Sequence, residues 1–300
     1  MRAGRFALYL AGAILTLYLY FALLHPRMQV ESHPVFAGKR TLAIAHQGGR
    51  GLWPENTLLA FERSLDLGVD VLEMDLRGTA DGQIVVHHDA SVERTTEGNG
   101  RVNALTLEEL RALDPGYRFE SERAGVVSHP YRGSSLVIPT FLEVMGRFPG
   151  ARLNVEMKDF DPALAITLCG MLRDNGFAQQ VIVASFEHEP MAAFRRACPE
   201  VATSATMREG LLFYQLGRLR LGSLYRSPAM AFQFPEYFGG IHVIRPELLE
   251  AAHSFNVQVH VWTVNEEEDL ERMLELGVDG ILTDYPDRLL RLMGRLARMP

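Results

Sequence analysis

Short apolar runs alternate with longer amphipathic stretches along most of this chain. The runs with the length of buried strands are Leu42–Ala45, Val69–Leu76, Leu153–Met157, Val181–Ser185, Val201–Ala205, Met230–Phe234, Val257–Thr263 and Gly280–Thr283. Helical periodicity lies between most of them, at Thr57–Leu67, Pro162–Asn175, Pro246–Ser254 and Glu266–Leu276. Strands that alternate with helices predict parallel βαβ units, and eight of them predict a closed (β/α)8 TIM barrel. The pattern alone also allows an open, doubly wound sheet.

The N-terminal part of the chain differs from this pattern. Phe6–Leu24 holds nineteen residues without a charge, which is close to the length that spans a bilayer as a helix. We therefore predict a transmembrane anchor over residues 1–25, a polar linker over 26–40 and the barrel over 41–300. A cleavable signal peptide is the alternative, but its apolar region is usually shorter. The flanking basic residues do not decide which side of the membrane the barrel occupies.

One segment interrupts the alternation of strands and helices. Val71–Asp89 contains two strand-like runs joined through Asp81-Gly82, a strong hairpin signal. Folding the segment symmetrically about this dipeptide sets Asp75 opposite His88. Residues 89–140 then form a long excursion with one clear short helix, Leu107–Leu113, so we predict an inserted subdomain after strand 2, beside the site.

Composition narrows the class of protein. The formal net charge of −7 argues against a broad nucleic-acid surface, although it allows a local cationic site for phosphate. The two cysteines, Cys169 and Cys198, fall in helical segments without a Cys-x-x-Cys spacing. We predict that they are buried free thiols.

Polar residues stand at the ends of several predicted strands, where the active site of a barrel lies. They are His46, Glu73, Asp75, His88, Glu156 and Lys158. Residues two apart on a strand share a face, so Glu73 lies with Asp75 and Glu156 with Lys158. Converging carboxylates need a cation, and oxygen ligands suit Mg²⁺ or Ca²⁺. With two histidines as general acid and base and a lysine for an anion, the set predicts metal-assisted displacement at phosphorus.

Several longer motifs recur in order along the chain. They are AHQGGRGLWPENTLLAF (Ala45–Phe61), VLEMDLRGTADGQIVVHHDASVERTT (Val71–Thr96), IPTFLEV (Ile138–Val144), NVEMK (Asn154–Lys158) and VWTVNEEEDL…GVDGILTDYPD (Val261–Asp287). Over about residues 41–290 the chain resembles the glycerophosphodiester phosphodiesterase family. The resemblance implies hydrolysis of a glycerol phosphodiester to a phosphomonoester and an alcohol, with a free glycerol hydroxyl attacking the phosphate first.

The resemblance also implies roles for the strand-end residues. His46 and His88 correspond to the catalytic pair, and Lys158 corresponds to a phosphate contact. The implied metal ligands are Glu73, Asp75 and Glu156. Which histidine assists the attack and which protonates the leaving alcohol stays open.

The chain departs from the family pattern directly after the first histidine. The family has an arginine there, whereas this chain has Gln47. Arg50, three residues on in a glycine-rich loop, is a candidate for the missing phosphate contact. A solvated loop residue is the other interpretation of Arg50.

Three further positions border the predicted site. Asn56 or Thr57 is expected to cap the following helix, and Glu55 is placed near the metal or in the same helix-start motif. Trp262, at the end of a late strand, either walls the pocket or packs in the core, and Asn265 is expected on the same rim.

The stretch Leu211–Tyr237 mixes large apolar residues with arginines, as interfacial segments do, and a helix that only covers the barrel is the alternative. It resembles the corresponding part of membrane-anchored family members with lysophospholipase D activity. We therefore expect contact with a lipid bilayer and glycerophosphodiester substrates that include lysophospholipids. Two other functions stay open, namely a non-catalytic membrane scaffold and a phospholipase that cleaves on the glycerol side of phosphate.

Overall fold

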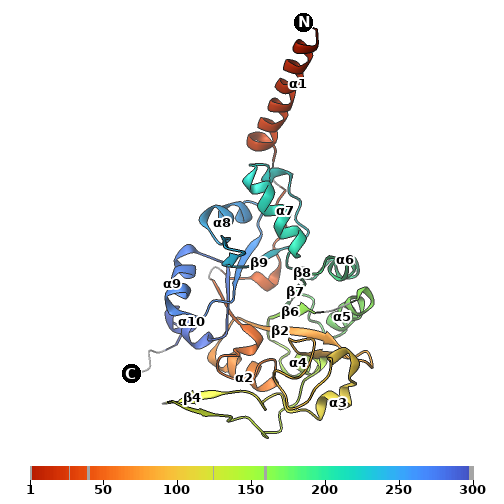
Figure 1. The fold of residues 1–300 in the computed structure, drawn as a ribbon, viewed down its shortest axis with the longest axis vertical. Helices are drawn as coiled ribbons and strands as arrows, with labels where there is room; N and C mark the ends of the chain where they lie inside the picture. Colours follow the sequence, from red (N-terminus) through yellow and green to blue (C-terminus); the bar gives the residue numbers. More distant parts are fainter. Residues whose placement is uncertain (1, 27, 39–40, 124, 159–160, 297–300) are drawn as a thin grey trace.

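Parallel strands form a barrel at the centre of the computed structural model, which describes residues 2–26, 28–38, 41–123, 125–158 and 161–296 (Figure 1). The strand order is β8-β7-β6-β2-β1-β13-β12-β9, and a parallel bridge between Ser204 and Ala231 joins the two ends. The bounds are β1 Leu42–Ala45, β2 Val71–Gly78, β6 Leu153–Met157, β7 Val181–Ala184, β8 Ala202–Thr203, β9 Ala231–Pro235, β12 Gln258–Trp262 and β13 Gly280–Thr283. Each predicted strand is confirmed, and the closed barrel replaces the open sheet.

Helices surround the barrel and follow most of its strands. They are α2 Leu58–Leu67, α4 Phe141–Arg147, α5 Pro162–Asp174, α6 His188–Ala197, α7 Met207–Arg218, α8 Pro246–His253, α9 Glu267–Leu276 and α10 Pro286–Leu292. Capping residues define the ends of these helices, as α2 shows. Thr57 caps α2 by accepting a hydrogen bond from the Ala60 N–H, and Gly68 ends it at a positive φ of 91°. The main hydrophobic core lies between the helices and the outward faces of the strands.

The hairpin after β2 has a register that differs from the prediction. β3 (Ile84–Val86) pairs antiparallel with β2, and the His87 N–H donates to the Asp75 carbonyl oxygen. The predicted pairing of Asp75 with His88 is therefore wrong by one residue. The Thr79 N–H bonds to the Gln83 oxygen around a loop of three residues rather than two, and this extra residue shifts the register.

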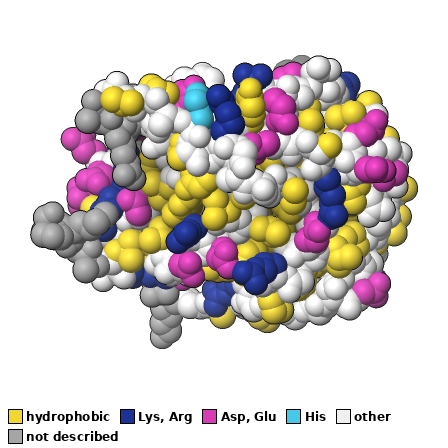
Figure 2. Space-filling view, turned by 90° about the horizontal axis from the view of Figure 1, so that it is seen from below, with side chains coloured by type: hydrophobic (Ala, Val, Ile, Leu, Met, Phe, Trp, Pro, Cys, Tyr) yellow, Lys and Arg dark blue, Asp and Glu magenta, His cyan; other side chains and the backbone are white. Residues whose placement is uncertain are grey.

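The excursion between residues 89 and 140 forms a small unit of its own. It holds the 3-10 turn η4 (Val102–Ala104), helix α3 (Leu107–Arg111) and the two-stranded ribbon of β4 (Ser121–Arg123) and β5 (Val126–Ser128). A separate apolar cluster supports it: Val85, Val92, Val102, Leu110 and Ile138. The face of the molecule in Figure 2 carries interspersed acidic and basic side chains rather than one continuous basic area.

The N-terminal apolar stretch is divided between helix α1 (Arg2–Leu19) and the π-helical turn η1 (Tyr20–Leu24). In the described part of the chain, no helix is both long enough and apolar enough to cross a membrane. The predicted transmembrane helix is thus not found. Figure 1 shows α1 projecting from the side of the barrel that carries α7. The Tyr18 hydroxyl donates to the Leu219 oxygen, and Ser223 in η5 (Gly222–Leu224) bonds to Phe21.

The described part of the segment predicted as a linker packs against the barrel; residues 27, 39 and 40 lie outside the described residues. The turn η2 (Pro34–Phe36) brings Val35 into a buried cluster with Ile182 and Ala202. The Phe36 ring lies 5.9 Å from the ring of His260, which is fully buried on β12. This segment therefore covers the barrel at the end opposite the carboxyl ends of the strands.

Cys169 of α5 and Cys198 at the end of α6 form a disulfide bond, so the prediction of two free thiols is wrong. Both side chains are buried, as predicted. The sequence alone does not show that two helices adjacent along the chain pack side by side and bring these residues together.

Reduction of this disulfide is expected to lower the free energy of unfolding by about 3–4 kcal/mol, because the bond closes a loop with a sequence separation of 29. Thermal unfolding with and without reductant measures the effect. The double variant Cys169→Ala/Cys198→Ala should melt at a lower temperature and no longer respond to reductant. Equal melting temperatures for the oxidised and reduced protein would contradict this.

Candidate active site

A pocket of about 290 Å³ opens at the carboxyl ends of the barrel strands. Its lining comes from the eight barrel strands or the residues that follow them, and from His88, which follows β3 of the hairpin. The lining residues are His46, Glu73, Asp75, His88, Asn154, Glu156, Lys158, Ala184, Ser185, Phe186, Ser204, Ala205, Gln233, Trp262, Thr263 and Leu282. All six residues predicted at strand ends are among them.

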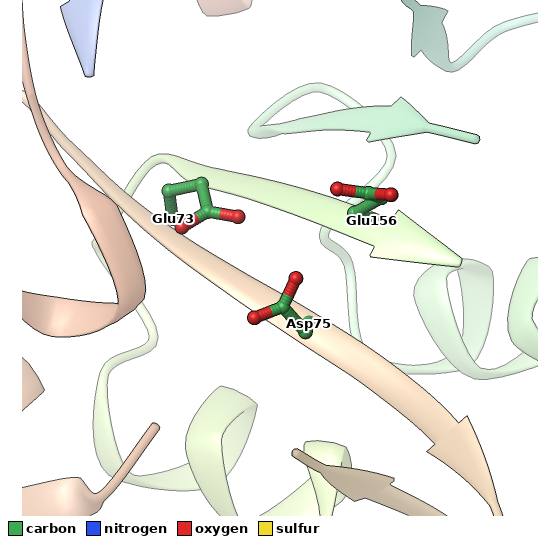
Figure 3. Close-up of side chains that lie close together, drawn as sticks. All are labelled: Glu73, Asp75 and Glu156. Atoms are coloured by element: carbon green, nitrogen blue, oxygen red, sulfur yellow. The ribbon is translucent and has the colours of Figure 1, made fainter. Parts of the chain in front are cut away.

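Three carboxylates meet on one side of this pocket (Figure 3). Glu73 and Asp75 lie on β2, and Glu156 lies on β6 directly opposite Asp75 in the parallel register. One oxygen from each lies within 4.8 Å of the others. Lys158, two residues beyond Glu156, places its Nζ 2.9 Å from Glu156 Oε1 and 3.3 Å from Asp75 Oδ1. One lysine only partly neutralises three clustered carboxylates.

Burial and the neighbouring charges shift the pKa values of all three carboxyl groups. Burial, together with the charge of Asp75, raises the pKa of Glu73 to about 8, and burial also raises that of Glu156. Burial acts on Asp75 in the same direction, but Lys158 and His88 hold its pKa below the ordinary value. A divalent cation fits this set, because all three donors are oxygens and the cluster lacks positive charge. Glu73, Asp75 and Glu156 would hold it.

Asp284 holds the first histidine in place. His46 directly follows β1, and its Nδ1 lies 2.6 Å from Asp284 Oδ1. Asp284 directly follows β13 and accepts a hydrogen bond from Asn265 Nδ2 at 2.8 Å. Burial lowers the pKa of His46, but the charges of Glu73 and Asp284 outweigh it and raise the pKa to about 8. With Nδ1 bound to Asp284, Nε2 faces the pocket, 4.0 Å from Glu73 Oε2.

A second carboxylate supports the other histidine. His88 Nδ1 lies 2.6 Å from Asp89 Oδ1, and Asp89 accepts from Arg94 Nε at 2.6 Å. Arg94 also binds both oxygens of Glu55, at 2.6 and 2.7 Å. For Glu55, a place near the metal was one of two expectations; in the structure it binds Arg94, which binds Asp89, the partner of His88. Neighbouring His87 is buried and bonds to the Ser91 oxygen, outside the pocket.

Gln47 lies behind the carboxylates rather than in the pocket. Its backbone N–H donates to Glu73 Oε2 at 2.6 Å, and its side-chain amide donates to Asp75 Oδ2 at 2.8 Å. Asn56 donates to the same Asp75 oxygen at 3.0 Å, and Thr57 is the helix cap. Gln47 is fully buried, so its amide orients a carboxylate and does not reach an anion in the pocket.

Arg50 also lies outside the pocket lining. Its Nε is 3.7 Å from Asp284 Oδ1, and its Nη1 donates to the Gln47 side-chain oxygen at 3.3 Å. These contacts place the guanidinium beside Asp284, the carboxylate that binds His46 Nδ1. Its suggested role as a phosphate contact stays a prediction.

An aromatic wall completes the pocket. Trp262 lines the pocket, which confirms the first of its two predicted positions. Its ring contacts the Phe186 ring edge to face, with the ring centres 5.9 Å apart. Phe186, after β7, is 43% exposed, and Lys158 Nζ lies 6.0 Å from the centre of its ring.

Several residues of the site were missed by sequence reasoning. Asp284 is a polar residue directly after an apolar strand, and the rule that found His46 should have found it too. Asp89 follows His88 at the end of the hairpin return, but nothing in the sequence marked it as the partner of that histidine. Arg94 lies in the excursion and carried no signal. Phe186 and Gln233 are apolar and neutral residues whose position at the pocket only the closed barrel reveals.

Comparisons with known proteins agree with this geometry. Residues 46–288 match the family model described as the glycerophosphoryl diester phosphodiesterase family. A glycerophosphodiester phosphodiesterase of Caldanaerobacter subterraneus subsp. tengcongensis is 35% identical over 85% of this chain and 98% of its own length. The lysophospholipase D GDPD3 of Mus musculus is 30% identical over 95% of this chain and 90% of its own length. A glycerophosphoryl diester phosphodiesterase domain from Mycobacterium tuberculosis shares the fold, with a TM-score of 0.74 and 23% identity over 86% of this chain and all of that one.

These matches define the class as a TIM-barrel phosphoric diester hydrolase. The chain belongs to the glycerophosphoryl diester phosphodiesterase family.

Cation binding is expected to strengthen with pH, by up to about tenfold per unit, until the pH reaches about 8. A cation that binds Glu73 must displace the proton of its carboxyl group below this pH, because the pKa of Glu73 is raised to about 8.

The raised pKa values of Glu73 and His46 also affect folding. They stabilise the cation-free protein at low pH, and this stability is lost as the pH rises toward 8. Titration calorimetry and thermal unfolding at pH 6, 7, 8 and 9 measure both effects. A cation affinity independent of pH between 6 and 8 would contradict the expectation.

Proposed function

We propose that this protein hydrolyses glycerophosphodiesters, including lysophospholipids, to a glycerol phosphomonoester and an alcohol, with Mg²⁺ or Ca²⁺ as cofactor. The observation that carries the proposal is the single pocket that gathers two histidines, three carboxylates and Lys158. When bound, the cation would neutralise the carboxylates and stabilise negative charge on the phosphate oxygens. Lys158 adds a fixed positive charge beside the same oxygens.

The two histidines are proposed to move the protons. Asp284 and Asp89 each hold an Nδ1, which leaves an Nε2 for the substrate. One imidazole accepts the proton of the attacking glycerol hydroxyl as its oxygen bonds to phosphorus. The other donates a proton to the departing alcohol oxygen as its bond to phosphorus breaks. Water then opens the resulting cyclic phosphate, with the two roles reversed.

Two observations support lysophospholipids as substrates. The relative from Mus musculus is a lysophospholipase D, and the pocket has an aromatic wall formed by Phe186 and Trp262. An acyl chain leaving the pocket would find apolar contact there. Comparing kcat/KM for lysophosphatidylcholine and glycerophosphocholine tests this part. Turnover of the water-soluble diester alone would limit the substrates to that class.

We further propose that the protein associates with membranes through α1. Large apolar side chains of this helix face outward, among them Phe6 (71% exposed) and Tyr9 (76%). Because disulfides persist in oxidising compartments, the Cys169–Cys198 bond favours a barrel outside the reducing cytosol.

A further inference from the structure

A short hairpin continues from the strand that forms one wall of the pocket. β9 contributes Gln233 to the lining, and its last residue, Pro235, pairs with Trp262 of the aromatic wall. The chain then forms β10 (Tyr237–Phe238) and β11 (Ile241–His242), joined by two glycines with positive φ. The hairpin therefore stands on the rim of the pocket, beside Trp262.

Polar contacts fix the base of this hairpin. Glu236, directly before β10, forms an ion pair with Arg272 of α9, and its Oε1 lies 3.5 Å from His242 Nε2. The Val243 N–H donates to the Glu236 carbonyl oxygen at 2.8 Å. The rings of Tyr237 and His242 stack with their centres 4.7 Å apart. These contacts hold the hairpin in one position on the barrel.

The end of the hairpin presents apolar side chains outward. Tyr237 is 58% exposed, Phe238 48% and Ile241 46%, and the last two are cross-strand partners. A two-stranded ribbon this short has no second layer against which to bury them. Exposed apolar side chains gathered at the rim of a pocket mark a contact surface.

The nature of the partner follows from the surroundings of the hairpin. The hairpin follows β9, whose last residue pairs with Trp262, and Trp262 contacts Phe186, whose ring centre lies 6.0 Å from the Lys158 ammonium. The charges at its base, Glu236 and Arg272, neutralise each other, so the surface suits an uncharged or zwitterionic partner. In Figure 1, β9 lies on the side of the barrel from which α1 projects with its exposed apolar residues. An apolar, electrically neutral partner that reaches both elements is a lipid surface.

We propose that the end of the β10–β11 hairpin inserts into a zwitterionic lipid–water interface and so sets the mouth of the pocket against the surface that holds the substrate. The choice of substrate in this inference rests on the proposed lysophospholipid activity. Aromatic and aliphatic side chains are the ones that interfacial elements bury at this depth. A lysophospholipid would then move its phosphate to Lys158 while its acyl chain stays beside Phe238 and Ile241.

The variant Phe238→Trp in the full-length protein tests the insertion without reference to turnover. Vesicles of brominated phosphatidylcholine containing lysophosphatidylcholine should quench the new fluorophore and shift its emission to shorter wavelength, after subtraction of the signal from Trp53 and Trp262. Val127→Trp, on the exposed β5 strand of the other hairpin, is the matched control and should show neither change. Unquenched emission from Phe238→Trp overturns the inference.

Kinetics separate this inference from the proposed function. The double variant Phe238→Ser/Ile241→Ser should lose roughly tenfold to a hundredfold in kcat/KM on vesicle-borne lysophosphatidylcholine, the range for two partly buried apolar side chains. Its activity on glycerophosphocholine should not change. An equal loss of kcat/KM on a monomeric short-chain lysophospholipid would show that the hairpin only contacts the acyl chain of the substrate, and it would overturn docking to the lipid surface. Quenching without lysophospholipid turnover would refute the proposed substrate and leave the docking surface intact.

Discussion

The His88→Ala and His46→Ala variants are each expected to turn over glycerophosphocholine 10²–10⁴-fold more slowly than the parent protein, the usual range for loss of a general acid or base. Both imidazoles line the pocket, and each has its Nδ1 bound to a carboxylate, which leaves its Nε2 for proton transfer. The measurement is kcat with saturating cation.

A surface histidine provides the control for these variants. His253 is exposed and pairs with Asp279 at 2.8 Å, and His253→Ala should keep full activity. The variant Asp284→Asn should fold normally but lower kcat and shift the pH profile, because the amide no longer raises the pKa of His46. Full turnover by His46→Ala and His88→Ala would show that neither histidine takes part in proton transfer.

The second large effect concerns the carboxylate cluster. Asp75→Asn should weaken binding of Mg²⁺ or Ca²⁺ by at least about a hundredfold, since even the residues that support metal ligands change affinity by 10–100-fold. Asparagine keeps the shape of the side chain but removes the charge that lies between Lys158 and Gln47. Titration calorimetry measures the affinity, and activity should fall with it.

An exposed carboxylate outside the site serves as the comparison for Asp75→Asn. Glu62 pairs only with Arg147 in the contacts described, and Glu62→Gln should bind the cation as the parent protein does. Unchanged cation affinity in Asp75→Asn would show that the cluster does not hold the metal.

The barrel and the centre of the site could be predicted because both follow from local patterns. Eight apolar runs marked the strands, and the rule that barrel sites lie at strand ends selected Glu73, Asp75 and Glu156 together. The parallel register that sets Asp75 opposite Glu156 then follows from the fold.

What the sequence left open depends on distances between segments. The Asp81-Gly82 dipeptide located the hairpin, but it did not show that the loop has three residues, so the pairing of Asp75 was displaced from His87 to His88. The disulfide required the packing of α5 against α6. The β10–β11 hairpin could not be predicted from the sequence, because its strands have two residues each and are too short to show an alternation of apolar and polar side chains.

Gln47 illustrates how a departure from a family pattern can be explained structurally. The residue takes a left-handed conformation, with φ of 52°, between His46 and two glycines. There its backbone N–H donates to Glu73 and its side-chain amide donates to Asp75. In this chain Gln47 therefore orients Glu73 and Asp75, whereas Lys158 is the basic residue that lines the pocket.

The most direct test of this account identifies the products by mass after the purified protein is incubated with glycerophosphocholine and Mg²⁺ or Ca²⁺. We expect glycerol phosphate and choline, formed only when the cation is present. Phosphocholine and glycerol would show cleavage on the other side of phosphorus, and no product with either cation would show that the barrel is not a catalyst of this reaction; either result contradicts the account.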